Sequence, residues 1–211
     1  MKILAIETAT EICSVAYCEE GRPVAVKEES APRKHSEVLP LFFEEVKDAA
    51  GFSLEALDGI AVSIGPGSFT GLRIGLSYAK GLAFSRGLPL VPVPTLLALA
   101  GNAEFSSDHS TVLLFSHRDI LFSQSVDISH GLPKQSDKPQ AMPWEKIESS
   151  LNGDVLHWNC GKFLNGKGTE IQPSASAVGR LADEHFSEWV NHEPFQLVPE
   201  YISPFETGGK K

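Results

Sequence analysis

Short apolar runs separated by turn residues fill the start of the chain. Residues 3–6 are continuously apolar, a pattern typical of a central strand that is buried on both faces. Two further strand-like runs follow at residues 14–17 and 23–27, each after a turn-like stretch, at 8–11 and 19–21. The pattern therefore predicts an antiparallel meander of three strands.

Helices and strands alternate from there to about residue 103. Ser36 is expected to cap a helix over residues 37–50 that Gly51 ends, and Thr95 is expected to cap a helix that runs to about residue 103. The other predicted elements are a helical turn at residues 53–57, a strand at 59–64, a long helix at 68–85 and a short strand at 90–93.

The second half restarts the strand pattern after a polar stretch, where we place a boundary between lobes of residues 1–104 and 105–211. Its predicted elements are a hairpin of residues 111–116 and 120–127 with a turn at 117–119, a long exposed connection at 131–143, a weaker strand at 154–158, a helix from Ser174 or Ser176 to about residue 189, and an irregular tail at 195–211. Two lobes that each open with a hairpin suggest a duplicated unit. The expected fold is therefore α/β, a two-lobed actin-like ATPase (ASKHA, ribonuclease H-like) fold with a reduced second lobe.

A glycine-rich turn at residues 64–71 leads into the long helix. Glycines allow backbone N–H groups to approach a ligand closely, and a helix N-terminus attracts phosphate. The segment nevertheless lacks both the GK[ST] of a Walker A loop and the GxGxxG spacing. We name Glu7, Thr8, Gly65, Gly67 and Ser68 as candidates for a nucleotide or phosphate contact, and we favour a structural role for the turn.

Small residues recur every four positions along the long helix, at Gly71, Gly75, Ala79 and Ala83. Such a stripe lets another element approach closely, while burial of the neighbouring leucines drives the contact. That element is either the protein's own sheet or a helix of another subunit. Ser68 is expected to cap the helix.

The predicted helix at residues 37–50 is apolar over more than half of its circumference. One side must pack on the sheet, and Phe42 and Phe43 cannot both point the same way, so the remaining apolar surface needs a second partner. We therefore predict a partner interface built from the two helices. Its predicted residues are His35, Val38, Leu39, Phe42, Phe43, Val46, Phe69, Gly71, Leu72, Gly75, Leu76 and Ala79.

Composition narrows the classes of function. The net charge of −9 argues against a protein that binds nucleic acid alone, so we expect a partner to hold any RNA. Cys13, Cys18 and Cys160 have no CxxC spacing, which indicates buried free thiols and no metal or other cofactor. No stretch approaches the ~18 apolar residues of a membrane span, and Glu7 interrupts the apolar start too early for a signal peptide. The expected location is the cytoplasm.

Four segments of the chain resemble the TsaB (YeaZ) family, the bacterial paralogues of TsaD in threonylcarbamoyladenosine modification of tRNA. These segments are ILAIETATEICSVAY at residues 3–17, KHSEVLPLFFEEV at 34–46, LDGIAVSIGPGSFTGLRIGLSYAKGLA at 57–83 and PVPTLLALA at 92–100. The resemblance covers about the first hundred residues, and IGPGSFTGLRIG is highly specific to the family. The tail PEYISPF resembles the family's C-terminal P-x-Y-L-R element without its Arg.

The resemblance implies a non-catalytic scaffold subunit. In the family, TsaB pairs with the catalytic TsaD through two helices of the N-terminal lobe, which correspond to residues 35–50 and 68–86 here, and homodimers use the same helices. The complex works with the ATPase TsaE and with TsaC, and it modifies the adenosine next to the anticodon of ANN-decoding tRNAs. For this chain the resemblance implies TsaD-like and TsaE-like partners, a homodimer in the absence of TsaD, contact with tRNA only through the complex, and no membrane.

The second lobe departs from the family pattern. Ser116, His117 and Arg118 stand where the family has an Asp-Ala-Arg-like turn, and the family's Gly-Asp-Gly turn is replaced around Cys160. Glu7 occupies a position that usually holds Asp. These changes count against a nucleotide contact of the second lobe and leave the first-lobe interface intact.

The residue pattern favours a protein without catalytic residues. The seven histidines contain no two that are three to five positions apart, so the HxxxH metal pair of TsaD is missing. We expect His35 to be a polar residue at a helix entry, and Glu7 alone is a poor candidate for holding a metal-bound water. The alternatives that remain are a stand-alone actin-like kinase or ATPase and, third, a glycoprotease-type metallopeptidase.

Overall fold

Strand β1 (Lys2–Glu7) lies at the centre of a five-stranded sheet because its residues 3–6 are fully buried on both faces. The sheet has the order β3-β2-β1-β4-β5, with β2 at Ile12–Glu19, β3 at Arg22–Ser30, β4 at Gly59–Gly65 and β5 at Leu90–Pro94. Strands β1 to β3 form the predicted antiparallel meander, and β4 and β5 run parallel to β1. The computed structural model describes residues 1–202, so the predicted tail beyond residue 202 lies outside the described residues.

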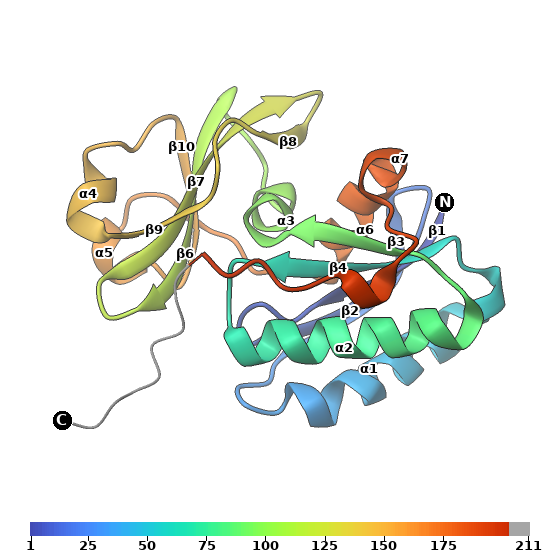
Figure 1. The fold of residues 1–211 in the computed structure, drawn as a ribbon. Coiled ribbons are helices and arrows are strands. Elements are labelled where there is room, and N and C mark those ends of the chain that lie inside the picture. Colours follow the sequence, from blue (N-terminus) through green and yellow to red (C-terminus); the bar gives the residue numbers. More distant parts are fainter. Residues whose placement is uncertain (203–211) are drawn as a thin grey trace.

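Helices α1 (His35–Ala50) and α2 (Phe69–Arg86) lie side by side on one face of this sheet (Figure 1). Ser68 caps α2 as predicted, because its Oγ accepts a hydrogen bond from the Gly71 N–H at 3.2 Å. The predicted cap at Ser36 is wrong, since α1 starts two residues earlier, with Lys34 at its N-cap. The buried His35 explains this start: its Nε2 lies 3.2 Å from the Ile12 carbonyl oxygen and fixes the first residue of the helix to strand β2.

A second sheet has the order β11-β10-β6-β7-β8, and β9 also pairs with β7. The predicted hairpin is confirmed, but the exposed connection predicted for residues 131–143 is wrong because it contains β8 and β9. Each is a four-residue strand that contains a proline, so its own sequence pattern does not predict a strand. Pairing with β7 is what makes both segments strands. The bounds are β6 His109–His117, β7 Ile120–Ser129, β8 Leu132–Gln135, β9 Gln140–Pro143, β10 Asp154–Trp158 and β11 Thr169–Glu170.

The single helix predicted to end near residue 189 is two helices, α6 (Ala175–Glu184) and α7 (Phe186–Trp189), with His185 between them. Ser174 caps α6, which decides between the two predicted caps. Helix α3 (Thr95–Gly101) begins at Thr95 itself, so the cap predicted there is wrong, and its hydroxyl has another role described below. The other short helices are η1 at Leu54–Ala56, α4 at Trp144–Glu148, α5 at Gly161–Leu164 and η2 at Pro194–Gln196.

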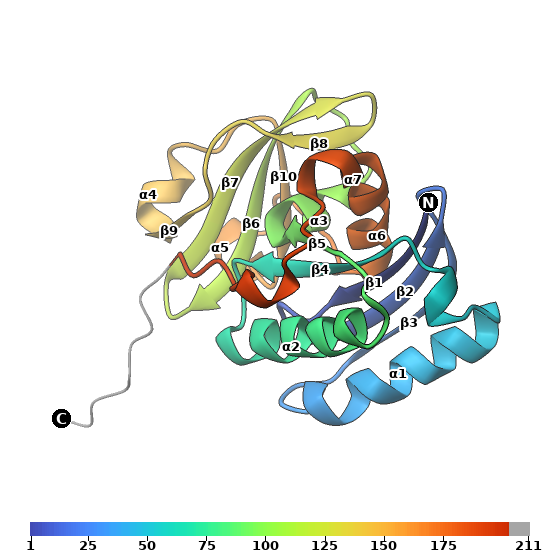
Figure 2. The ribbon, with the colours of Figure 1, turned by 45° about the vertical axis from the view of Figure 1, so that its right-hand side comes forward.

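Helices α3 and α6 lie between the two sheets and share one apolar core with both of them (Figure 2). Helix α6 comes from the second half of the chain, yet it packs on β1 and β2 of the first sheet. A second core lies under α1 and α2, and a third lies between the outer face of the second sheet and α4 and α5. The limits of the two lobes, residues 1–104 and 105–211, stay a prediction. None of the helices in residues 1–202 is long and apolar enough to cross a membrane.

Candidate functional site

The glycine-rich turn packs closely against the β1–β2 turn of the same chain. The Ser68 N–H donates to the Ala9 carbonyl oxygen at 2.6 Å, and a Cβ on Gly67 would overlap that same carbonyl. Gly65 has a φ of +125°, and a Cβ there would lie 2.5 Å from the Glu200 carbonyl oxygen. The glycines therefore permit close packing of backbone on backbone, and contact of Gly65, Gly67 and Ser68 with a nucleotide stays a prediction.

Thr95 supplies the acceptor for a buried backbone donor of this turn. Its Oγ1 accepts a hydrogen bond from the Gly65 N–H at 3.0 Å, and Thr95 is itself buried. Thr95→Val keeps the shape and leaves this N–H without its partner, so we expect a loss of about 1–3 kcal/mol in the free energy of unfolding by urea. Thr95→Ser keeps the hydroxyl and is the control. Equal stability of Thr95→Val and the wild type would contradict this role.

The small-residue stripe of α2 faces the protein's own first strand. A Cβ on Gly71 would overlap the Thr8 carbonyl oxygen, and one on Gly75 would overlap the Thr8 hydroxyl. Ala79 and Ala83 are fully buried in the core under the helix. The predicted docking role is therefore wrong for Gly71, Gly75 and Ala79, because close approach of α2 to β1 is what requires their size.

Glu7 and Thr8 are buried at the end of β1. One oxygen of the Glu7 carboxyl accepts a hydrogen bond from the Ala9 N–H at 2.5 Å, and the Thr8 hydroxyl donates to the Gly71 carbonyl oxygen at 2.9 Å. Burial raises the pKa of Glu7 from 4.5 to about 7, against the opposing effect of its hydrogen bonds. The Thr8 hydroxyl thus connects the end of β1 to α2, the Glu7 carboxyl holds the turn that follows β1, and their predicted contact with a nucleotide stays untested.

A cleft of about 540 Å³ separates the turns of the first sheet from the second sheet. Ser68 and Gly67 line it on one side, and Phe115 and Trp158 line it on the other. Glu7 and Thr8 are not among its lining residues. A hydrogen bond of 2.5 Å from the Asn159 amide to the Glu11 carboxylate connects residues that both line the cleft.

The wide apolar surface of α1 is covered largely by the chain itself. Phe43 makes edge contacts with Phe52 and Tyr78, at centroid distances of 6.4 and 6.0 Å, while the Lys27 ammonium lies 5.3 Å from the centre of the Phe42 ring. The two rings point to different neighbours as predicted, but both neighbours are intramolecular. Several predicted interface residues are buried within the chain: His35, Leu39, Phe42, Phe43, Val46, Leu72 and Leu76.

An apolar groove of about 600 Å³ remains open between α1 and α2, and we name it the α1–α2 groove. Of the predicted residues, Phe69 and Leu39 line it, and Val38 is half-buried on α1 outside its lining. On the outer surface of α1, outside the lining of the groove, Leu41 exposes 61% of its surface. The sequence does not predict which residues reach the surface here, because it does not show which side of each helix is buried against the sheet. These are Pro40, Arg73, Ile74, Ser77 and Tyr78.

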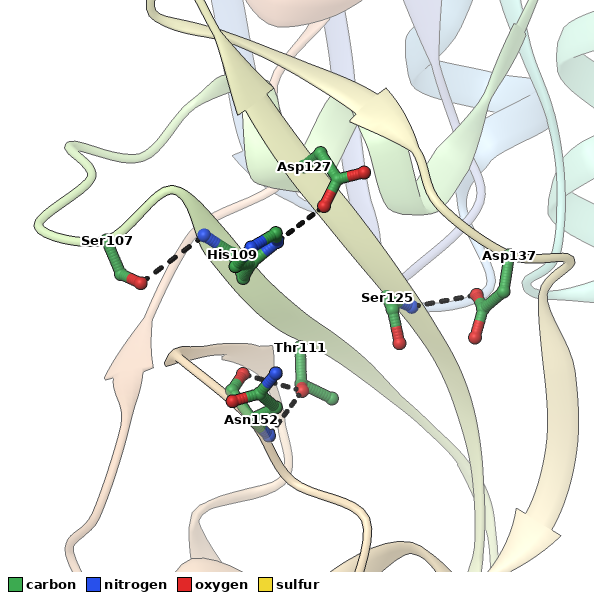
Figure 3. A network of polar contacts seen from close by, with 7 residues as sticks. All are labelled: Ser107, His109, Thr111, Ser125, Asp127, Asp137 and Asn152. Carbon is green, nitrogen blue, oxygen red and sulfur yellow. Dashed lines mark hydrogen bonds and ion pairs between the residues drawn. The ribbon is translucent and has the colours of Figure 1, made fainter.

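A polar network on the second sheet brings together a serine, a histidine and an aspartate (Figure 3). The Nδ1 of His109 lies 2.5 Å from the Asp127 carboxylate, but Ser107 accepts only from the backbone N–H of His109. The serine hydroxyl is thus bonded to the chain and not to the imidazole, which is not the arrangement of a catalytic triad. Nearby, the Thr111 hydroxyl bonds the backbone of Asn152. The network fixes the ends of β6 and β7 to their loops.

Residues 1–202 contain no group of three or more His, Cys, Asp or Glu side chains placed to hold a metal ion. The three cysteines are buried and free, as predicted.

Comparison with known proteins gives one family-model match and close relatives. The model of the TsaD family, tRNA N6-adenosine threonylcarbamoyltransferase, matches residues 25–124. The tRNA threonylcarbamoyladenosine biosynthesis protein TsaB of Escherichia coli is 43% identical over 161 residues, which are 74% of this chain and 65% of the relative. The matched part therefore spans less than two thirds of that relative's length.

Solved structures agree over nearly the whole chain. A Pseudomonas aeruginosa protein with similarity to the peptidase YEAZ superposes with a TM-score of 0.83 at 27% identity, covering 96% of this chain and 99% of its own. The ethanolamine utilization protein EutJ of Carboxydothermus hydrogenoformans has a TM-score of 0.54 at 13% identity over 85% of this chain and 89% of its own, and it shares the fold alone. The predicted α/β actin-like fold is confirmed.

Proposed function

The chain belongs to the TsaB (YeaZ) family, and on this premise we propose that it is a non-catalytic subunit in tRNA threonylcarbamoyladenosine biosynthesis. It pairs with a TsaD-like subunit through α1 and α2, and a TsaE-like ATPase acts with the pair. Without the TsaD-like subunit the same face forms a homodimer. The tRNA is bound by the complex, because a chain with a net charge of −9 is poorly suited to hold it alone.

The observation that carries this proposal is the apolar α1–α2 groove, which stays open between two surface helices. Contiguous exposed apolar surface of this kind marks an interaction site on a folded protein. Apolar and aromatic residues line the groove, including Pro40, Phe69 and Tyr78. Its lining also has polar and charged side chains, from Ser36, Thr70, Arg73 and Ser77. This composition suits the packing of a helix from another subunit.

The scaffold role is supported by the surroundings of the only carboxylate that was a catalytic candidate. Glu7 is buried and bonded to the Ala9 backbone, and the cleft walls do not include it. A stand-alone kinase or ATPase would need a carboxylate that can reach its metal and nucleotide. We therefore expect negligible ATP hydrolysis by the isolated chain, and robust turnover that Glu7→Ala abolishes would overturn the scaffold proposal.

Leu41→Glu tests the docking face. The substitution puts a charge on the exposed surface of α1, next to Pro40 in sequence, without touching the core, so we expect at least about tenfold weaker association with the TsaD-like subunit of the same organism, measured by calorimetry. The control is Val26→Glu on β3. Val26 is 41% exposed and pairs with Ala16, which belongs to the core on the face of the sheet opposite to α1 and α2. Wild-type affinity in Leu41→Glu would exclude this face.

A further inference from the structure

The C-terminal segment, residues 194–202, runs along α2 in the opposite direction, and we name it the strap (Figure 2). Its start lies near the end of α2, where Phe195 meets Phe84 at a centroid distance of 5.6 Å, and its end lies near the start of α2, where Tyr201 meets Phe69 at 4.8 Å. The helix rises about 22 Å between Phe69 and Phe84, and an extended chain covers about 20 Å between Phe195 and Tyr201. The two lengths are similar, so the strap follows the helix along most of its length, beginning with the short helical turn η2.

Side chains of α2 hold the strap by its backbone. The Lys80 ammonium donates to the carbonyl oxygens of Phe195 and Leu197, at 3.2 and 2.7 Å. The Glu200 N–H donates to the carbonyl oxygen of Ile64 at 2.8 Å, which attaches the strap to the end of β4. Because backbone groups and Leu197 make these contacts, Phe195, Val198 and Tyr201 are left exposed, while Ile202 at the end of the strap packs against the core between the sheets.

The exposed side chains of the strap continue the apolar surface of the α1–α2 groove. Val198 exposes 70% of its surface, and Phe84, Phe195 and Tyr201 are also exposed. Phe69 and Arg73 belong to both regions: they line the groove, and the Arg73 guanidinium stacks 3.8 Å from the centre of the Phe69 ring while its Nε donates to the Tyr201 hydroxyl at 2.9 Å. Tyr201 thereby fixes the wall of the groove.

We propose that the strap is part of the docking surface and contacts the TsaD-like subunit directly, with Tyr201 as a positioning residue for Phe69 and Arg73. This inference rests on the proposed function and extends its interface beyond the two helices. Charge indicates the chemistry of the opposing surface: α2 carries three basic residues and no acidic one, in a chain with a net charge of −9. The partner surface that meets the strap is therefore apolar with carboxylates facing Arg73.

Val198→Glu tests the contact, because Val198 is exposed and makes none of the bonds that hold the strap. We expect about tenfold weaker association with the TsaD-like subunit and an unchanged melting temperature. For Tyr201→Ala we expect weaker association that Tyr201→Phe largely restores, since the ring that stacks on Phe69 is kept. Val26→Glu is again the control, and raising the salt concentration should weaken association of the wild type.

The outcomes separate the two proposals. If Leu41→Glu loses the partner while Val198→Glu and Tyr201→Ala bind like the wild type, the strap lies outside the interface and this inference is overturned. If the wild type itself does not associate with the TsaD-like subunit, the proposed function fails and the strap contact fails with it.

Discussion

Gly71→Ala and Gly75→Ala are expected to destabilise the protein strongly, by about 3 kcal/mol or more each. The added methyl group would overlap the backbone carbonyl of Thr8 in the first variant and the Thr8 hydroxyl in the second. Over-packing of a buried contact costs about 1–3 kcal/mol and more where backbone must move, and neither α2 nor β1 can shift without opening the core beneath. Unfolding in urea measures the loss.

Gly81→Ala on the same helix is the matched control. A Cβ at Gly81 meets nothing within 4 Å, so the substitution adds only helix propensity, and we expect a gain of about 0.5–1 kcal/mol. A loss of stability in the Gly71 and Gly75 variants, together with a gain in the Gly81 variant, would establish that the stripe faces the protein's own strand. Variants at Gly71 and Gly75 that stay as stable as the wild type but lose the TsaD-like partner would return the stripe to the docking surface.

The same stripe explains how far sequence reasoning reaches. The spacing of Gly71, Gly75 and Ala79 identifies a close approach, but periodicity is the same whether the neighbour belongs to the chain or to a partner. The choice depends on Thr8, which lies 63 residues from Gly71 in the sequence and meets it only after β1 and β4 have paired. Strand β1, by contrast, was predictable because a continuous apolar run carries its own evidence of burial.

Helix α1 shows the same limit at the candidate docking face. The sequence correctly predicts that this helix is apolar over much of its circumference. The apolar surface that the sheet leaves uncovered is covered by Lys27 of β3 and by Phe52 just after the helix. Neither contact leaves a periodic signal. Leu41, which stays exposed, looks like the buried Leu39 in sequence, so the residues that reach the surface could only be found from the fold.

The packing of the strap along α2 is the largest feature of the fold that the sequence does not predict. Its pattern of prolines and polar residues predicts an irregular tail, and it contains only one short helical turn. Its attachment comes from Lys80 and Arg73, more than 110 residues away, and the lysine bonds carbonyl oxygens that every residue type has. A contact that depends on backbone atoms cannot be recognised from side-chain pattern.

The second large effect is a pH dependence of stability that originates at Glu7. The pKa of its carboxyl is raised by burial from 4.5 to about 7 in the folded protein. Between these two pH values the folded state holds a proton that the unfolded state has released, so the free energy of unfolding falls as pH rises. The fall is complete above about pH 7, and it amounts to at most about 3 kcal/mol at ~1.4 kcal/mol per pKa unit.

Glu7→Gln should remove this dependence, because the amide is neutral at every pH and its oxygen can still accept the Ala9 N–H. We expect the variant to be more stable than the wild type by about 1–3 kcal/mol at pH 8 and close to it at pH 5, in urea unfolding at both values. Glu37→Gln, on the exposed first turn of α1, removes the same charge from the surface and is the control.

If the difference in the free energy of unfolding between the wild type and Glu7→Gln is the same at pH 5 and pH 8, the carboxyl does not titrate in this range, and Glu7 is ionised in the folded protein. A buried anion beside the glycine-rich turn would then need a cation, which would reopen the question of whether this family member binds a metal-nucleotide pair.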